Sequence, residues 1–280
     1  KKVGLISCIG YIKNNLEKTN LFNFIESEKE NEIITVLGVG GVGKSIFTLN
    51  LSNTFKEEKN KILIIDFDIL NDSLHTILGV KKYSKKIKNR IKKNNLLEKI
   101  NIKELIIKID KNIDLISGVN ILFDKKYKIS SKKIKNILDE LKKDYKYILI
   151  DTSNECFFDY TKELIINSTK SIFLVEPNLN EIKKAKKLLD FYKNNWRINK
   201  EKINIVYNKM SDISISENIL ENIFDEYNVI GEMKYSKYYN MLINCNMRVR
   251  KSEIEQEFKK IKNNLFERVM NYGIRKGTIK

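Results

Sequence analysis

The chain has 280 residues, of which 42% are hydrophobic, and it carries a formal net charge of +17 at pH 7. This length suits one large α/β domain, alone or with a small appendage, and the hydrophobic content excludes a disordered chain. The chain contains three cysteines, Cys8, Cys156 and Cys245, and one histidine, His75. They share no metal-ligand spacing, which disfavours a zinc site or a disulfide framework and favours a cytoplasmic protein. No apolar run approaches the length of a membrane span.

The positive charge is partly local. Residues 81–111 hold twelve Lys and Arg residues against three acidic ones. A surplus of this size indicates either an anionic partner, such as nucleic acid or a membrane surface, or compositional drift in a chain rich in Lys, Ile and Asn. Composition leaves both interpretations open.

Short apolar runs alternate with longer amphipathic segments after residue 31, whereas residues 1–31 fit no such pattern. The runs are almost continuously apolar, which is typical of strands buried on both faces. They cover residues 33–37, 62–65, 113–116, 147–150, 172–175, 203–207 and 229–233, and helices are expected over 46–55, 131–143, 180–194 and 214–227. This rhythm predicts an α/β fold with a mostly parallel central sheet and helices on both faces. We interpret residues 1–31 as a short N-terminal extension, or as the remnant of a missing domain.

The segment Gly38-Val-Gly-Gly-Val-Gly-Lys-Ser45 directly follows the first apolar run and precedes the first predicted helix. It matches the phosphate-binding pattern G-x-x-x-x-G-K-[ST] at every fixed position. Glycines let backbone N–H groups close around phosphate oxygens, and the following helix points its positive end at them. Lys44 would reach the terminal phosphates and Ser45 would bind Mg²⁺. The strand and helix on either side favour a nucleoside triphosphate site over an accidental Gly-rich turn.

Acidic residues follow two of the other predicted strands. Asp66 and Asp68 come after residues 62–65, and Asp151 comes after residues 147–150. Near a polyphosphate, one carboxylate can hold the Mg²⁺ shell while another orients or deprotonates water. The alternative is that each aspartate caps the turn or helix after its strand.

Taken in order, these motifs resemble the MinD/ParA superfamily of P-loop ATPases. The phosphate loop is followed by Ile-Asp-Phe-Asp ending at Asp68, and then by Tyr-Ile-Leu-Ile-Asp ending at Asp151. Further segments, residues 173–178, 206–209 and 230–235, resemble the superfamily's downstream elements, so the likeness spans residues 32–280. Within the superfamily, the Glu-Pro loop at residues 176–177 and the helix after it look closest to the TadZ/CpaE group.

The resemblance implies an ATPase domain with ATP and Mg²⁺ as ligands. By position, it assigns nucleotide binding to Gly38, Gly40, Gly41, Val42, Gly43, Lys44, Ser45, Ile46, Asn208 and Lys209, with Asn208 as the adenine contact. It assigns the metal to Ser45, Asp66 and Asp151, and catalysis to Lys44 and to Asp68, which would orient the attacking water. It also implies a homodimer that forms in the ATP state and dissociates after hydrolysis.

The sequence departs from the family pattern in several places. Val39 stands where the family usually has a lysine that reaches the partner's ATP, so we expect slow hydrolysis. Lys234 replaces a common proline, and residues 151–156 replace the usual Pro-Pro-Gly run of switch II. Iron-protein reductases of the superfamily hold an iron–sulfur cluster with cysteines at positions close to that of Cys156. The other two cysteines of this chain lack the spacing that such a cluster needs, so we expect Cys156 to be a plain thiol. His75 is expected to be a packing or surface residue.

The C-terminal segment 253–272 has apolar residues at helical spacing with lysines between them. It is interpreted as a helix docked on the sheet, with a membrane-lying basic helix as the alternative.

Three functions are compatible with these sequence features. The resemblance favours an ATP-switched protein that positions pilus, secretion or cell-pole machinery, located in the cytoplasm, at a pole or at a membrane surface. The alternatives are a ParA-like partition ATPase that binds DNA non-specifically, which the basic charge favours, and a metabolic ATP-dependent ligase or synthetase.

Overall fold

The computed structural model describes residues 31–58, 60–69, 71, 73–85, 87–88, 101–122, 128–153, 158–237 and 252–266. The contacts within the chain divide it into two units, Lys1–Asn31 and Glu32–Lys280, and the fold below belongs to the second unit. The predicted N-terminal extension lies outside the described residues except for Asn31, and so do all three cysteines.

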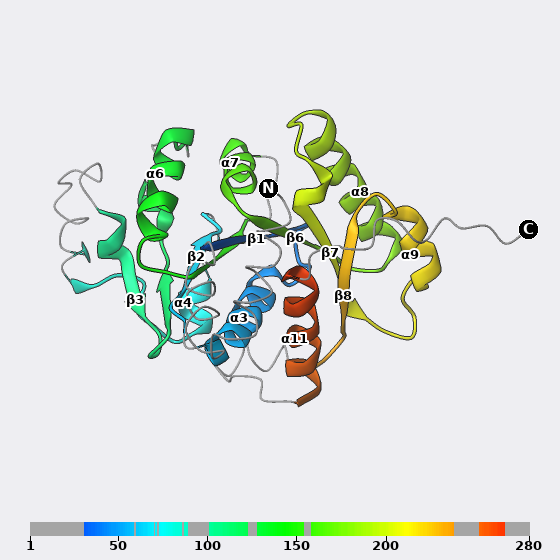
Figure 1. Cartoon of the computed structure of the whole chain (residues 1–280), viewed down its shortest axis with the longest axis horizontal. Coiled ribbons are helices and arrows are strands. Elements are labelled where there is room, and N and C mark those ends of the chain that lie inside the picture. Colours follow the sequence, from blue (N-terminus) through cyan, green and yellow to red (C-terminus); the bar gives the residue numbers. More distant parts are fainter. Residues whose placement is uncertain are drawn as a thin grey trace, which may run out of the picture. The chain divides into compact units, whose positions relative to one another are not determined.

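A single sheet forms the centre of the described domain (Figure 1). Its strands are β1 (Glu32–Gly38), β2 (Ile62–Phe67), β3 (Ile106–Lys108), β4 (Ile113–Ile116), β5 (Tyr147–Thr152), β6 (Lys170–Val175), β7 (Ile203–Met210) and β8 (Asn228–Lys234). Their order is β3-β4-β2-β5-β1-β6-β7-β8, and every described pair is parallel except β3 with β4. The predicted mostly parallel sheet is therefore confirmed.

Each of the seven apolar runs forms a strand. β1, β2, β5 and β6 are buried along almost their whole length, as expected for strands with helices on both faces. Strand β3 was not predicted from the sequence. It has only three residues, all partly or fully exposed, and it lies at the sheet edge in antiparallel pairing, so it gives no burial signal.

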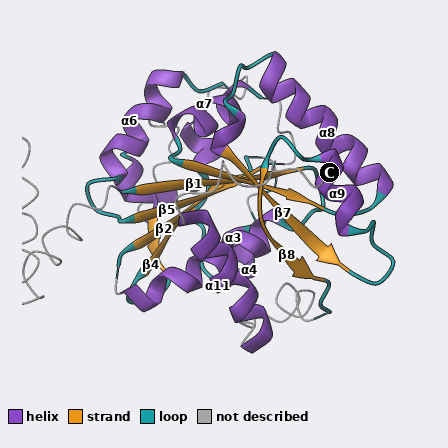
Figure 2. Ribbon diagram, turned by 45° about the vertical axis from the view of Figure 1, so that its right-hand side comes forward, coloured by secondary structure: helices purple, strands orange, loops and turns teal. Residues whose placement is uncertain are grey.

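Helices cover both faces of the sheet, as expected (Figure 2). One layer contains α3 (Lys44–Thr54), α4 (Leu74–Ile77) and α11 (Ser252–Phe266). The other contains α6 (Ser131–Leu141), α7 (Asp159–Asn167), α8 (Leu179–Asn194) and α9 (Glu217–Ile223). The helix expected over residues 214–227 is shorter than predicted. The N–H of Ile215 donates to Pro177, which holds the preceding loop, and the chain leaves helical geometry at the buried Phe224.

The apolar face of α11 is buried against α3 and the sheet. Ile254, Phe258, Ile261 and Leu265 are each at most 7% exposed. The ring of Phe258 lies 5.2 Å from that of Phe47, measured between centroids. This confirms the docked helix and contradicts the membrane-lying alternative over residues 254–265, because that face has no apolar surface left to insert into lipid. Residues 267–272 of the predicted helix lie outside the described ranges.

Across the part of the chain that the structure describes, no helix combines the length and apolarity needed to cross a bilayer.

Truncation of Phe258 tests the docking of α11. Phe258→Ala removes a ring that is 2% exposed, and we expect the free energy of unfolding to fall by about 3–5 kcal/mol. Chemical denaturation followed by circular dichroism measures the loss. The matched control is Asn263→Ala at an exposed position of the same helix, which should change stability by less than ~0.5 kcal/mol. Equal responses of the two variants would contradict the docked arrangement.

Candidate functional site

The predicted phosphate loop connects β1 to α3 at the carboxyl edge of the sheet. β1 ends at Gly38, and α3 begins at Lys44. Gly43 is the N-cap of α3 in the left-handed conformation, with φ of 96°, and no side chain of the described residues caps the helix there. The first N–H groups of an α-helix have no partner within the helix, so this end can donate hydrogen bonds to a phosphate.

Two of the glycines in the loop have steric reasons to be glycine. A Cβ on Gly38 would lie 2.8 Å from the backbone oxygen of Leu174 on the adjacent strand β6. A Cβ on Gly43 would lie 3.0 Å from Nδ2 of Asn208. The loop is therefore closely packed between β6 and the end of β7, and a side chain at either glycine would push it out of place.

Lys44 is 5% exposed and lies against its own loop. Its Nζ donates to the backbone oxygens of Gly38 at 3.1 Å and Val39 at 3.3 Å. These are neutral acceptors, and a phosphate oxygen would bind the ammonium more strongly. The position suits the predicted role of Lys44 toward the terminal phosphates.

Asp151 at the end of β5 is fully buried, and neither carboxyl oxygen accepts a hydrogen bond with ordinary geometry from the described residues. Burial raises the pKa of this carboxyl to about 7, although the nearby Ser45 hydroxyl and Lys44 ammonium lower it, and the charge of Asp68 raises it further. A buried carboxyl of this kind fits a divalent cation. Within the described ranges no three His, Cys, Asp or Glu side chains form a metal cluster. Ser45 and Asp151 would therefore hold Mg²⁺ together with phosphate oxygens and water, as is usual for this ion.

Asp66 lies directly opposite Asp151 in the pairing of β2 with β5. Its Oδ1 accepts a hydrogen bond from the N–H of Asp68, and its Oδ2 accepts one from the N–H of Leu74, both at 3.1 Å. Asp66 thus holds the turn after β2 and the start of α4, as the capping alternative describes. Its place in the metal shell stays a prediction.

Asp68 is 8% exposed, and its Oδ1 accepts a hydrogen bond from the N–H of Asn71 at 3.0 Å. Because its charge raises the pKa of Asp151, it lies within electrostatic reach of the predicted metal site. Its role in orienting water stays a prediction.

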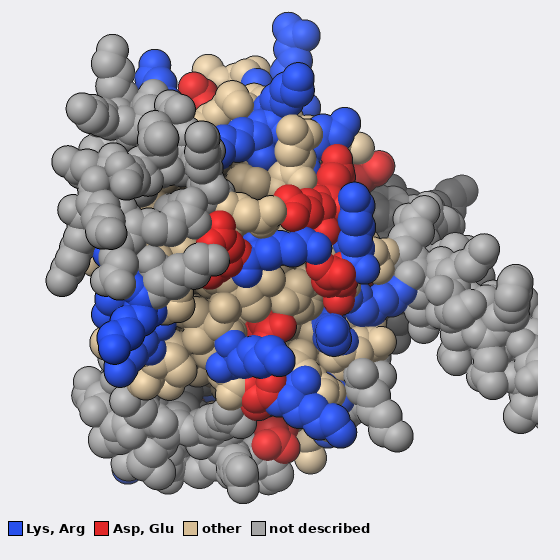
Figure 3. Space-filling view, turned by 90° about the vertical axis from the view of Figure 1, so that its left-hand side faces the viewer, with Lys and Arg blue, Asp and Glu red and all other residues tan. Residues whose placement is uncertain are grey.

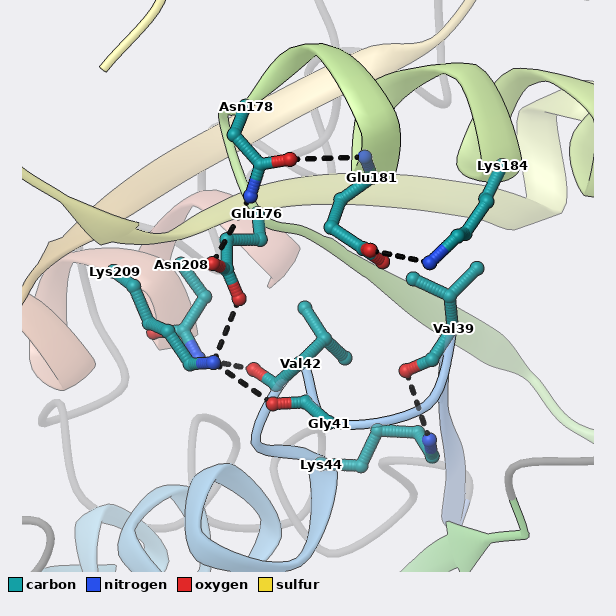
Figure 4. A network of polar contacts seen from close by, with 10 residues as sticks. All are labelled: Val39, Gly41, Val42, Lys44, Glu176, Asn178, Glu181, Lys184, Asn208 and Lys209. Carbon is teal, nitrogen blue, oxygen red and sulfur yellow. Dashed lines mark hydrogen bonds and ion pairs between the residues drawn. The ribbon is translucent and has the colours of Figure 1, made fainter. Parts of the chain in front are cut away.

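Asn208 and Lys209 at the end of β7 both reach the phosphate loop (Figure 4). Nδ2 of Asn208 donates to the backbone oxygen of Val42 at 2.7 Å, and Nζ of Lys209 donates to that of Gly41 at 2.8 Å. The structure therefore brings these predicted residues to the loop from across the sheet. Glu176, which forms an ion pair with Lys209, was not among the predicted site residues. The Glu-Pro sequence at residues 176–177 was the only feature of the sequence that drew attention to this loop.

The remaining predicted residues take simpler positions. Gly40 and Gly41 are exposed at the tip of the loop, while Val42 and Ile46 are buried beneath it. The His75 ring is half-buried and bonds to the Ser117 hydroxyl at 3.2 Å, a position that suits a packing or surface residue. Cys156 and the rest of the switch II segment after Ser153 lie outside the described residues.

Known proteins resemble this chain in sequence and in fold. A family model described as an AAA domain matches residues 31–205, more than half of the chain. The septum site-determining protein MinD of Helicobacter pylori is 29% identical over 175 residues, which cover 56% of this chain and 57% of that protein. The chain belongs to the MinD/ParA superfamily of P-loop ATPases. The fold is also that of MinD from Pyrococcus horikoshii, solved with Mg-ADP, with a TM-score of 0.67, 19% identity and coverage of 85% of this chain and 96% of that one.

An uncharacterized protein of Methanocaldococcus jannaschii is 37% identical over 122 residues, which cover 41% of this chain and 47% of that protein. The chain thus spans about half the length of these two curated relatives.

The buried carboxyl of Asp151 predicts a characteristic pH dependence. Its pKa is raised from 3.8 to about 7 on folding, so the unfolded chain loses this proton at a lower pH than the folded one. The stabilisation of the folded state is therefore complete below pH 4 and is lost as the pH rises through 7. Asn cannot ionise, so Asp151→Asn removes this pH-dependent loss of stability. Without nucleotide, we expect the variant to be the more stable protein at pH 8, by up to about 4 kcal/mol, with the difference shrinking toward pH 4.

Denaturant titrations across this pH range measure the difference. Asp139→Asn on α6, where the side chain is 51% exposed, is the control for loss of a carboxylate. A gain in stability that does not vary with pH would contradict the assignment.

Proposed function

We propose that this chain binds Mg-ATP and acts as a nucleotide-switched dimer that positions other machinery, in the manner of the TadZ/CpaE group. Two neighbouring features carry the proposal. No described side chain caps the start of α3 at Gly43, and the buried carboxyl of Asp151 lies near Ser45 in the first turn of that helix. The first suits phosphate and the second suits a divalent cation, and a nucleoside triphosphate with Mg²⁺ supplies both.

The positioning role is supported by the relatives and by the sequence around α8. Three of the relatives carry the name septum site-determining protein, one of them as putative, and a MinD of Aquifex aeolicus was solved in complex with MinC. By analogy, the partner is a protein of a pilus, secretion or cell-pole system, reached from the cytoplasm or at a membrane surface. The Glu176-Pro177 loop before α8 supports the TadZ/CpaE-like assignment.

Hydrolysis should be slow, because the phosphate loop presents Val39 where the superfamily usually has a lysine. A cation supplied across a dimer interface to the transferred phosphoryl group is worth several orders of magnitude in rate. The ATP state would then persist long enough to mark a position.

Light scattering with Mg-ATP or Mg-ADP, together with phosphate release, tests this function. We expect a dimer with Mg-ATP only, slow turnover, and loss of nucleotide binding in Lys44→Ala. Val39→Lys should raise turnover by at least about tenfold without weakening nucleotide binding. A wild-type chain that remains a monomer with Mg-ATP would refute the switched dimer, and fast wild-type turnover would refute the role given to Val39.

A partition-type function is the second candidate, and basic surface favours it. A cavity of about 680 Å³ beside β3 is lined in part by Lys81, Lys82, Lys85 and Lys88. A putative plasmid partition protein from Borrelia burgdorferi, solved with AMPPNP, has the same fold, with a TM-score of 0.65, 23% identity and coverage of 84% of this chain and 98% of that one. Against it, Figure 3 shows Lys and Arg side chains interspersed with acidic ones on the side that carries β3. Lys103 pairs with Asp144 and Lys56 with Asp110.

DNA binding separates the two candidates. A partition ATPase should bind non-specific duplex DNA with Mg-ATP and not with Mg-ADP, and should lose orders of magnitude in affinity between about 50 and 200 mM salt. Fluorescence anisotropy at two salt concentrations measures this. Under the positioning proposal we expect weak binding that does not depend on the nucleotide.

A further inference from the structure

The end of β7 has an unusual backbone conformation where it faces the phosphate loop. Lys209 has a backbone φ of 64°, in the left-handed region that residues other than glycine rarely adopt. The pairing of β7 with β8 shifts register between Tyr207 and Met210, so Asn208 and Lys209 leave the ladder. Such irregularities redirect side chains, and the surrounding contacts must hold a strained residue in place.

Two contacts hold the Lys209 side chain. Its Nζ donates to Oε2 of Glu176 at 2.6 Å and to the backbone oxygen of Gly41 at 2.8 Å (Figure 4). The Glu176 and Lys209 side chains are only 28% and 34% exposed, so solvent screens the pair less than it would a fully exposed one. Lys209 therefore connects the turn after β6 to the tip of the phosphate loop.

Glu176 is itself held in place. Its Oε1 accepts a hydrogen bond from Nδ2 of Asn178 at 3.1 Å. Oδ1 of Asn178 accepts one from the N–H of Glu181 at 3.0 Å and so caps α8. The carboxylate is thus fixed to the start of a sixteen-residue helix that packs on the sheet through Ile182 and Leu189.

The tip of the phosphate loop has little packing of its own. Gly41 is exposed, and a Cβ built on it would meet no described atom within 4 Å. The donors on Lys209 and Asn208 bind the carbonyls of Gly41 and Val42. Because each peptide unit is planar, fixing these two carbonyls also fixes the direction of the next N–H groups, those of Val42 and Gly43. The Val42 N–H donates to the backbone oxygen of Val39 at 3.4 Å, so of these two the Gly43 N–H is the group that a phosphate would need.

We infer that Glu176 is a positioning residue for nucleotide binding, which acts through Lys209 to hold the phosphate loop in its binding shape. This inference rests on the proposed Mg-ATP function and adds a residue outside the phosphate-loop pattern. Glu176 orients the ammonium, the ammonium fixes the Gly41 carbonyl, and the loop pays less conformational entropy when phosphate binds.

The test is the affinity of Glu176→Gln, Lys209→Met and the double variant for Mg-ATP, measured by isothermal titration calorimetry. We expect each single variant to bind about tenfold more weakly than wild type, as for loss of a charge-assisted hydrogen bond. The double variant should be no weaker than Lys209→Met, because Glu176 acts only through Lys209. Lys209→Arg, which keeps donors for both partners, should recover most of the affinity.

The matched control is Glu226→Gln, which breaks the ion pair of Glu226 with Lys193 away from the phosphate loop and should leave affinity unchanged. Thermal unfolding without nucleotide separates a positioning effect from a loss of fold, and Lys209→Met gives the same readout if Glu176→Gln folds poorly. Wild-type affinity in Glu176→Gln, or additive losses in the double variant, would overturn the inference alone. A wild-type chain that does not bind Mg-ATP would overturn the proposed function and this inference with it.

Discussion

The parallel pairing of β1 with β5 on one side and β6 on the other is the constraint on which the site depends. Its register places Val36 opposite Asp151 and Gly38 opposite Leu174. Because neighbouring parallel strands end at the same edge, the phosphate loop, the buried carboxyl and the turn before α8 meet there, although they are far apart in the chain. The strands stay in this register because both faces of β1 and β5 are buried under helices.

Several locally unfavourable features gather at this edge of the sheet. Asp151 is buried and accepts no hydrogen bond of ordinary geometry from the described residues, Lys209 adopts a left-handed conformation, and no described side chain caps the start of α3. Each of these costs stability by itself. An anionic ligand would satisfy the start of α3, and a divalent cation would satisfy the Asp151 carboxyl. Their coincidence at one place argues for a binding site more strongly than any one of them, since proteins violate local rules mainly where function requires it.

The C-terminal helix supports the same site indirectly, through α3, which lies beside it in the same layer. α11 packs on α3 through Phe258 and Phe47, and Phe266 lies edge-on to Phe55 just after α3. Nζ of Lys262 also donates to the backbone oxygen of Thr54, the last residue of α3. α3, whose start faces the expected phosphate position, is thus held along its length by α11. The apolar face of α11 is therefore part of the core and is not available to a membrane surface.

The sequence by itself determined the phosphate loop, seven of the strands and the alternation of strand and helix. These features follow from fixed spacings over a few residues and from apolar periodicity, which act locally. Only the tertiary structure decided that Asp66 holds the start of α4, that α11 is buried, that β3 extends the sheet, and that Glu176 and Lys209 brace the loop. Lys209 and Gly41 are 168 positions apart. Their contact depends on strand order, register and the irregularity in β7, and none of these is encoded within a short stretch of sequence.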